Sequence, residues 1–239
     1  AALCPGDTVI TGDASIRNNR PMAPLLEALH LGGVSASSSR DNGYAPIIIK
    51  GPYHPGDIFV DGEDSQHVSA LMLLASFTPG RSAIHVKNSG ERPWLDMTLY
   101  WLDILGVIYE RKNSDTYIIE GKKSYEAFTV KIPSDFSAAA YPAVATLLSG
   151  GAITLHNIDM ADPQGDKKLF SVLQELGGNI LYDETKHTLK VFGGHSLTGK
   201  TIDVNDIIDA LPLLAVVGCY AEGETHLING AIARKKESN

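Results

Sequence analysis

Apolar residues are spaced along the chain in two patterns, one typical of helices and one typical of strands. A spacing of i, i+3, i+4 and i+7 places one apolar face on a predicted helix that contains Leu169, Val172, Leu173 and Leu176. Gly177 follows at the position where glycine commonly ends a helix. Short β-branched runs flanked by Gly or Pro predict strands at 47–49 and 129–132. The chain is therefore predicted to alternate helices with short strands.

This succession of elements repeats along the chain with a step of about 72 residues. Small residues followed by a predicted strand mark each copy, around Gly6, Gly80, Gly151 and Gly223. A Leu-Gly pair at the end of a predicted helix keeps the same step, at Leu31-Gly32, Leu105-Gly106 and Leu176-Gly177. Two unrelated landmarks with one period indicate a supersecondary unit that is copied along the chain and packs against its neighbours. We predict an α/β fold built from repeated βαβαββ units.

Both ends of the chain are ragged with respect to this repeat. Residues 1–3 resemble the tail of a helix, and Asn239 follows a charged cluster early in the fourth copy. We therefore expect these residues to be a fragment of a longer protein.

Composition narrows the classes of partner. With 44% hydrophobic and 20% charged residues, the chain is typical of a folded α/β protein. A net charge of −8 disfavours nonspecific nucleic-acid binding, which needs a basic surface. The longest uncharged apolar stretch, 210–221, is shorter than the roughly 20 residues that span a bilayer. We expect no nucleic-acid partner and no membrane anchor, so an anionic ligand must meet a local basic cluster.

The two cysteines, Cys4 and Cys219, belong to no CxxC motif and no Cys/His cluster. This spacing argues against a structural zinc site and against a disulfide scaffold. We expect a cytoplasmic protein without a bound metal.

One local basic cluster is the pair Arg17 and Arg20, in a Gly-led loop from Gly12 that is predicted to deliver Pro21 to the first turn of a helix. Free backbone amides at a helix N-terminus and guanidinium groups both suit carboxylate or phosphate oxygens. An isolated arginine pair is more often simply part of a solvated loop.

Acidic residues precede predicted helices at equivalent places in the repeat. Asp64 stands before Gly80 as Asp135 stands before Gly151, and Asp209 has a similar position in the fourth copy. Each is an obvious candidate to cap a helix. Repeated units also place equivalent loops on one face, where a shared cleft can collect them.

Five motifs, in order, resemble those of the 5-enolpyruvylshikimate-3-phosphate synthase family over essentially the whole chain. They are the 12–22 loop, Asp61-Gly62 with Ser65-Gln66, Asp135 with Ser137, Gln164-Gly165-Asp166, and Lys236-Glu237-Ser238. The resemblance implies the enolpyruvyl transferase architecture, an inside-out α/β barrel built from about six such units in two domains. The chain would then hold the later part of the first domain, residues 1–126, and the earlier part of the second, residues 127–239.

The same resemblance implies the substrates and the reaction. The enolpyruvyl group of phosphoenolpyruvate would pass to the 5-hydroxyl of shikimate 3-phosphate, with release of phosphate and with neither a metal nor an organic cofactor. On the family pattern Arg20 would hold phosphoenolpyruvate, Ser65 would hold the shikimate phosphate, and Gln66 would lie between the substrates. Asp135 is a further expected substrate contact. The full-length protein is expected to be a monomer.

Catalysis would need a base for the hydroxyl and an acid for the enol methylene. The resemblance implies Asp209 as the carboxylate that faces the attacking hydroxyl, with Lys236 and Glu237 completing proton transfer. Asp209 lies within an apolar run, which is unusual unless its charge is used or paired. The remaining basic residues of the family pattern fall outside this chain, so the fragment itself is expected to be inactive.

The chain departs from the family pattern at two places. Asp64 replaces the first of two serines before Gln66, and Glu91-Arg92-Pro93-Trp94 stands where the family has a Ser-basic-Pro-Tyr site for the shikimate phosphate. Arg92 keeps the cation and Trp94 can stack or donate a hydrogen bond, whereas Glu91 donates only when protonated. Either the substrate shifts its pose or these side chains turn away.

Two alternatives remain open at this point. A UDP-N-acetylglucosamine enolpyruvyl transferase shares the fold, but that family typically carries a nucleophilic cysteine in the loop that corresponds to 12–17, and this chain has none there. A noncatalytic binding relative would explain Asp64 and Glu91, whereas the retained Asp209, Lys236 and Glu237 argue against it. Sensitivity to a cysteine-directed inhibitor would separate the first alternative, and ligand binding without turnover would separate the second.

Overall fold

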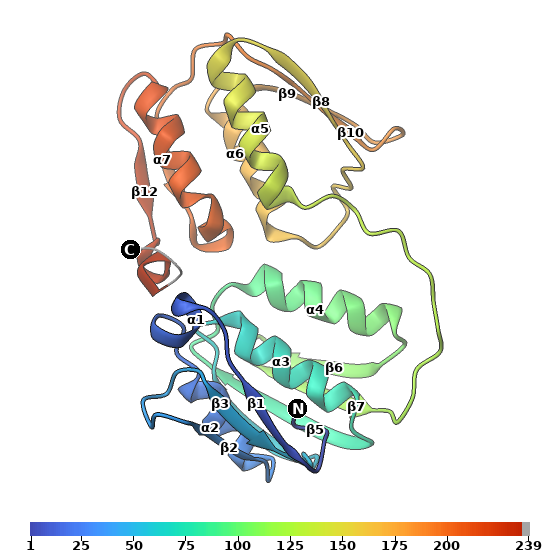
Figure 1. Ribbon diagram of the computed structural model, residues 1–239. Helices are drawn as coiled ribbons and strands as arrows, with labels where there is room; N and C mark the ends of the chain where they lie inside the picture. The colour runs from blue at the N-terminus through green and yellow to red at the C-terminus, as the bar shows by residue number, and fades with distance from the viewer. Residues whose placement is uncertain (236–239) are drawn as a thin grey trace. The chain divides into compact units, whose positions relative to one another are not determined.

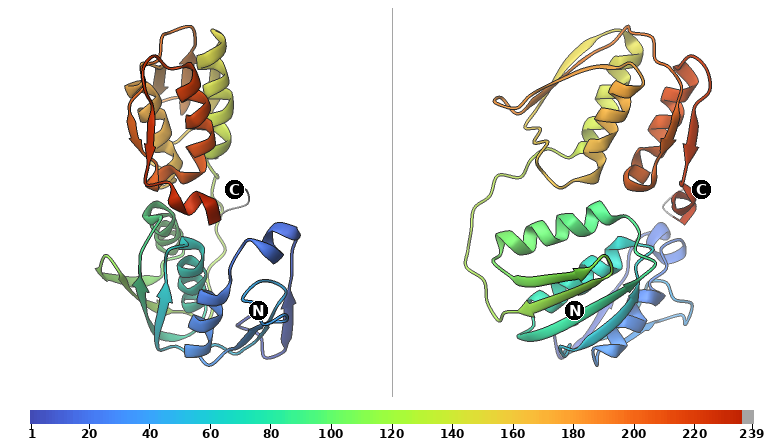
Figure 2. Two further views of the ribbon diagram at one scale, coloured as in Figure 1. Left: turned by 90° about the vertical axis from the view of Figure 1, so that its left-hand side faces the viewer. Right: turned by 180° about the vertical axis from the view of Figure 1, so that it is seen from behind.

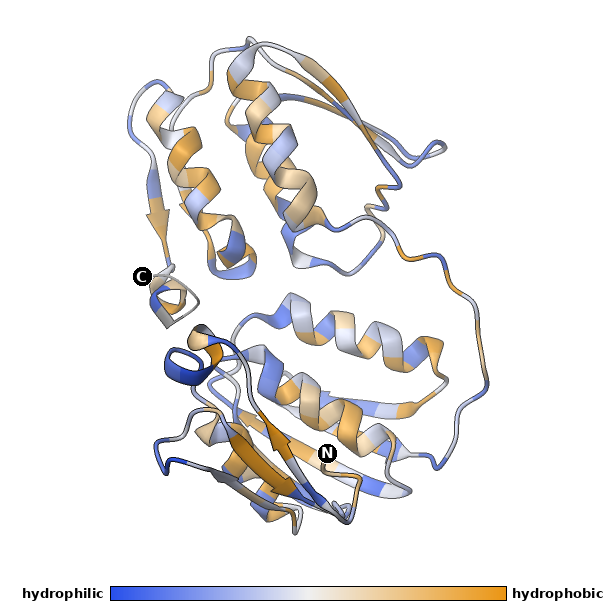
Figure 3. Ribbon diagram, viewed as in Figure 1, coloured by the Kyte–Doolittle hydropathy of each residue, from blue (hydrophilic) through white to orange (hydrophobic). Residues whose placement is uncertain are grey.

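The computed structural model describes residues 1–235, and these form two compact units, Ala1–Phe128 and Thr129–Ala233 (Figure 1). Both units mix helices with small sheets, and each has its own hydrophobic core. Apolar residues colour much of strand β3 (Ile47–Lys50) and of helix α7 (Leu211–Tyr220) (Figure 3).

The first unit contains a four-stranded and a three-stranded sheet. The four-stranded sheet has the order β4-β5-β7-β6, formed by β4 (Asp57–Asp61), β5 (Gly80–Lys87), β7 (Thr116–Gly121) and β6 (Ile108–Asn113). Its β4 and β5 are parallel, and the other pairs are antiparallel. The three-stranded sheet has the order β1-β3-β2, in which β3 lies between β1 (Asp7–Ile10) and β2 (Ser35–Ser38).

Four helices accompany these sheets. They are α1 (Ala14–Asn18), α2 (Ala23–Leu31), α3 (Ser65–Ser76) and α4 (Arg92–Ile104). Helix α3 packs on β5 and β7, and α4 lies beside α3 (Figure 2). The core between them includes Leu71, Leu95 and Ile119, each with at most 1% of its surface exposed.

The second unit has an antiparallel sheet of order β8-β10-β9 and a parallel pair, β11 and β12. Its strands are β8 (Ala152–His156), β9 (Asn179–Asp183), β10 (Thr188–Phe192), β11 (Thr201–Asp203) and β12 (His226–Ile228). Helices α5 (Phe136–Ser149), α6 (Lys168–Glu175) and α7 are joined by the 3-10 helices η1 (Gly165–Lys167) and η2 (Asn205–Ala210), and η3 (Ala231–Lys235) follows β12. The ring centroids of Phe136 and Phe170 lie 5.8 Å apart, in edge-to-face contact between α5 and α6.

The predicted repeat is confirmed by the order of elements. The run β4-α3-β5-α4-β6-β7 is one complete βαβαββ unit and supplies the whole four-stranded sheet. The predicted helix ends are also confirmed, since Gly32 is the C-cap of α2, and Gly106 and Gly177 follow α4 and α6 with positive φ angles of 61° and 104°. The apolar face predicted for α6 is buried, with Leu169 and Leu173 fully covered.

The strand predicted at 129–132 is wrong: the structure has no strand there. Within the described residues β8 pairs with β10 alone, so the segment has no ladder of backbone hydrogen bonds. Val130 and Ile132 are therefore exposed. The end of the segment is nevertheless attached, because the Ser134 N–H donates to the Asn157 carbonyl over 2.9 Å and the Asn157 side chain donates to the Ile132 carbonyl over 3.0 Å.

An asparagine follows each of β5, β8 and β12, and those after β5 and β12 tie the ends of a parallel strand pair together. Asn88, Asn157 and Asn229 are all left-handed, with φ angles of 56°, 59° and 61°. The Asn88 Nδ2 donates to Asp61 over 2.9 Å, which ties the end of β5 to the end of β4. The Asn229 Nδ2 donates to Asp203 over 2.8 Å and does the same for β12 and β11. Asparagine suits this position because its short amide tolerates left-handed backbone and reaches a neighbouring strand.

Candidate functional site

The loop before α3 leads into two of the predicted binding residues, Ser65 and Gln66, at the N-terminus of that helix. Asp61 ends β4 with an Asx turn, in which its Oδ1 accepts the Glu63 N–H over 3.0 Å. Asp64 is the N-cap of α3, and its Oδ1 accepts the Gln66 N–H over 2.9 Å. Ser65 is buried, and the side chain of Gln66 is exposed. The capping role predicted for Asp64 is confirmed.

Ser65 is bonded to the carboxylate of Glu91, which the sequence could not predict. The Ser65 hydroxyl donates to Glu91 Oε2 over 3.0 Å, and the Ser65 N–H lies 3.4 Å from the same oxygen. Glu91 is the N-cap residue of α4, but its side chain forms no cap hydrogen bond with that helix. Its backbone is left-handed, with φ 44° and ψ 45°. Only 5% of its surface is exposed, so the carboxylate is buried against α3.

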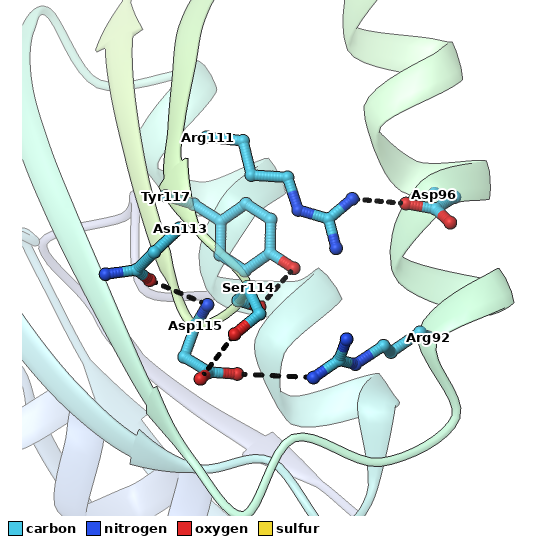
Figure 4. A network of polar contacts seen from close by, with 7 residues as sticks. All are labelled: Arg92, Asp96, Arg111, Asn113, Ser114, Asp115 and Tyr117. Atoms are coloured by element: carbon cyan, nitrogen blue, oxygen red, sulfur yellow. Dashed lines mark hydrogen bonds and ion pairs between the residues drawn. The ribbon is translucent and has the colours of Figure 1, made fainter.

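Arg92 points toward the turn between β6 and β7. Its Nη2 lies 3.8 Å from Asp115 Oδ1 in a half-exposed ion pair (Figure 4). In the same view, Arg111 donates to Asp96 on α4 over 3.0 Å. Exposed pairs of this kind contribute at most about 1 kcal/mol, so Arg92 could be released at small cost. Trp94 lies half-buried in the first turn of α4. Its backbone N–H donates to the Glu91 carbonyl over 3.1 Å.

The loop that carries Arg20 differs from its predicted form. Asp13 caps the short helix α1 by accepting the Ile16 N–H over 3.0 Å. The prediction that Pro21 lies in the first turn of the next helix is wrong, because α2 begins at Ala23 and Pro24 takes that place. Both prolines suit a helix start, and the chain uses the second one. Arg20 itself is half-buried.

His67, in the first turn of α3, connects the Arg20 loop with this helix. The backbone carbonyl of Pro21 accepts a hydrogen bond from its ring. Burial lowers the pKa of His67, and this effect outweighs the nearby carboxylates of Asp64 and Asp61 and the Pro21 hydrogen bond, which raise it. The ring is therefore held neutral over a wider pH range than an exposed histidine.

A second cluster lines a small pocket in the Thr129–Ala233 unit. The pocket is lined by Ser137, Ala140, Tyr141, Asp166, Leu169, Asp209, Ala210 and Leu213. Asp209 lies near the end of η2 and is exposed, so solvent explains how an acid is tolerated in that apolar run. Asp166 is almost fully buried, and the Ser137 hydroxyl donates to its Oδ2. The two carboxylates and two hydroxyls that line this pocket can bind and position a polar ligand and exchange a proton with it.

Asp135 acts as the N-cap of α5 and does not line this pocket. Its Oδ1 accepts the Ser137 N–H over 2.8 Å and lies 3.4 Å from the Ala138 N–H. Gln164 steadies the same helix start, since its side chain accepts the Phe136 N–H over 2.9 Å and donates to the Ser134 carbonyl over 3.1 Å. The cap explains why an aspartate stands here, and a substrate role for Asp135 stays a prediction.

Sequence reasoning missed three pocket residues as site residues: Ser137, Tyr141 and Asp166. Ser137 and Asp166 do belong to motifs that the sequence brought out. The one signal for Tyr141 in the sequence is its position four residues after Ser137, which places both on the same face of a helix. The predicted catalytic residues Lys236 and Glu237 lie outside the described residues.

A larger hollow in the first unit is lined by none of the residues predicted to bind substrate or to act in catalysis. It is lined by Pro24, Glu27, Phe59, Val60, Asp61, His85, Val86 and Lys87. The rings of Phe59 and His85 stack there, with centroids 4.7 Å apart. Within residues 1–235, no group of three or more His, Cys, Asp or Glu side chains is placed to hold a metal ion. In that same range no helix has both the length and the apolar character to cross a bilayer.

Solved structures with the same fold are enolpyruvyl transferases. An EPSP synthase from Acinetobacter baumannii superposes with a TM-score of 0.71 and 23% identity, and the match covers 99% of this chain and 55% of that one. The enolpyruvyl transferase NikO from Streptomyces tendae gives a TM-score of 0.71 with 17% identity, over 93% of this chain and 52% of that one. These likenesses confirm the predicted fold class, although the described residues form no closed barrel.

Curated relatives match at higher identity. The 3-phosphoshikimate 1-carboxyvinyltransferase of Acetivibrio thermocellus is 42% identical over 239 residues, which are 100% of this chain and 56% of the relative. The enzyme of the same name from Chlamydia caviae is 39% identical over 241 residues, 100% of this chain and 53% of the relative. The chain thus spans about half the length of the curated relatives it matches. Its sequence also fits the family described as EPSP synthase (3-phosphoshikimate 1-carboxyvinyltransferase) over residues 1–239. With the match unbroken from end to end, the chain belongs to the EPSP synthase family.

Proposed function

We propose that the complete protein transfers the enolpyruvyl group of phosphoenolpyruvate to the 5-hydroxyl of shikimate 3-phosphate and releases phosphate. The observation that carries this proposal is the family match along all of residues 1–239. The reaction needs cations for two phosphorylated substrates, a base for the hydroxyl and an acid for the enol methylene. It needs neither a metal nor an organic cofactor.

Each proposed role belongs to a residue of the family pattern. Arg20 binds phosphoenolpyruvate, and Ser65, Gln66, Arg92, Trp94 and Asp135 contact the substrates. Asp209 faces the attacking hydroxyl, and its exposure in a pocket with Asp166 supports this role because a base must reach its substrate. Lys236 and Glu237 complete proton transfer. We also infer a cytoplasmic monomer, a setting that suits the exposed free thiols of Cys4 and Cys219.

The test is phosphate release by the complete gene product that carries these 239 residues, supplied with phosphoenolpyruvate and shikimate 3-phosphate. UDP-N-acetylglucosamine is the competing acceptor, and a reaction without acceptor is the blank. Release that depends on shikimate 3-phosphate is expected. Loss of a positioned acid or base lowers rates by about 10² to 10⁴, so Asp209→Asn should lower kcat by that factor. Release with the nucleotide sugar alone, or with neither acceptor, contradicts the proposal.

A further inference from the structure

The carboxylate of Glu91 occupies the position at the start of α3 that favours an anion. Helix α3 has 12 residues, and its N-terminal end carries partial positive charge from free N–H groups. Both donors of Ser65 face the same oxygen of Glu91, with the hydroxyl at 3.0 Å and the N–H at 3.4 Å. An oxygen of a bound phosphate would use the same two donors. The carboxylate oxygen of Glu91 thus uses the two donors that a phosphate oxygen would use.

The backbone around Glu91 is arranged to hold the carboxylate there. The residue is left-handed, a conformation that is unfavourable for a non-glycine residue. Glu91 starts α4, yet its side chain leaves that helix without a side-chain cap and bonds to α3. The Gly90 N–H donates to the Gly62 carbonyl over 3.0 Å, which fixes this turn beside the loop that leads into α3. The contact is therefore a built feature of the fold.

The charges around Ser65 make simultaneous binding of a phosphate unfavourable. Asp64 is the neighbouring residue in sequence and already caps α3 with its own carboxylate. A phosphate bound to Ser65 with Glu91 in place would put like charges within a few ångströms, where they repel strongly in a partly buried setting. The carboxylate of Glu91 must leave Ser65 before a phosphate takes its donors. Arg92, the next residue, forms an exposed ion pair with Asp115, which it can break at small cost.

We infer that Glu91 is a specificity-determining residue that competes with the phosphate of shikimate 3-phosphate for the donors of Ser65. The inference rests on the proposed function, because it assumes that this substrate binds at α3. It predicts an enzyme whose affinity for shikimate 3-phosphate is set by the displacement of its own side chain. Binding of phosphoenolpyruvate, which the family pattern assigns to Arg20, is not affected.

The experiment compares variants of the complete gene product in steady-state kinetics, with KM measured separately for each substrate. Glu91→Gln keeps the size of the side chain and an acceptor for the Ser65 hydroxyl but removes the charge. Glu91→Ser vacates the position. Both should lower KM for shikimate 3-phosphate by about tenfold or more and leave KM for phosphoenolpyruvate within about twofold. Glu110→Gln removes the same charge from an exposed position on β6 and should change neither constant.

A double-mutant cycle with Ser65→Ala tests the mechanism. The gain from Glu91→Ser should shrink in the Ser65→Ala background, because only the backbone N–H of residue 65 then remains for the carboxylate and the phosphate to compete for. Unchanged KM values in both Glu91 variants, with the wild-type protein active, would overturn the inference alone and leave the proposed function standing. Wild-type protein that neither turns over nor binds shikimate 3-phosphate in calorimetry would overturn both. An equal change in KM for both substrates would mean that Glu91 acts on the whole fold, and it too would overturn the inference.

Discussion

His67 is a buried residue whose neutral form is favoured in the folded chain, because burial lowers its pKa below the ordinary value of 6.5. The unfolded chain therefore takes up a proton at His67 as the pH falls through 6.5, whereas the folded chain does not until the lowered pKa is reached. The stability contribution is complete above about pH 6.5 and is lost as the pH falls from there to the lowered pKa.

Urea unfolding at about pH 7.5 and about pH 5.5 measures this effect. Tryptophan fluorescence is a suitable signal, since Trp94 and Trp101 both belong to α4. The His67→Gln variant should lose less stability on acidification than the wild-type chain does. His54→Gln, which changes an exposed histidine, should behave like wild type. An equal loss for His67→Gln and wild type would show that another group is responsible.

At the scale of single residues, the sequence predicts local contacts and misses distant ones. The caps formed by Asp64 and Asp135 are predictable because a cap bonds to amides two or three residues away. The contact between Ser65 and Glu91 joins residues 26 positions apart. It depends on how α3 and α4 pack, and no spacing in the sequence encodes that packing. The partner of Arg92, Asp115, is hidden for the same reason.

At the scale of elements, the asparagine that follows β5 should stabilise the parallel strand pair. Asn88→Ala removes the hydrogen bond to Asp61 and puts alanine in a left-handed conformation, so we expect a loss of about 1 to 2 kcal/mol in the free energy of unfolding. Asn88→Gly removes the same hydrogen bond but relaxes the backbone, so its loss should be smaller. Urea unfolding of both variants measures the difference. Equal losses would mean that the left-handed backbone contributes nothing.

Of the two β-branched runs predicted as strands, the one that pairs with neighbouring strands is a strand, and the one without a paired neighbour among the described residues is not. The run at 47–49 became the centre of a sheet, because Ile47 and Ile49 are buried between neighbours on both sides. The run at 129–132 has the same β-branched composition without a paired neighbour among the described residues. Propensity for a strand describes how well side chains fit a sheet, so it cannot create a strand alone.

At the scale of the whole molecule, the segment between the two cores should be the first part of these residues to be cut by trypsin. Residues 122–135 have no regular secondary structure, and Lys123 and Lys131 are exposed. Limited proteolysis followed by mass spectrometry should find early cleavage after these two lysines, because exposed irregular backbone fits a protease best. Replacing both with glutamine should delay cleavage. Earlier cleavage after Arg111, which lies in β6, would contradict this expectation.

The overall architecture was predictable because a structural repeat produces a periodic pattern in the sequence. A period of about 72 residues carried by two independent landmarks is a signal that single elements do not have. The candidate site has no such period. Its parts come from loops at equivalent places in different copies, and the sequences of these loops differ from copy to copy, as 61–65 and 132–136 illustrate.

The attachment of Ser134 to Asn157 has a consequence for how strand β8 could be extended. The hydrogen bond of 2.9 Å already holds one end of the 129–132 segment at a fixed place beside the end of β8. The two segments are therefore already close together, and further pairing costs no additional loop-closure entropy. If the segment pairs with β8, pairing starts from this hydrogen-bonded end, which already fixes the register of the two strands. Closure would also pair the backbone edge of β8 that is free within the described residues, and an open edge of that kind is prone to aggregate.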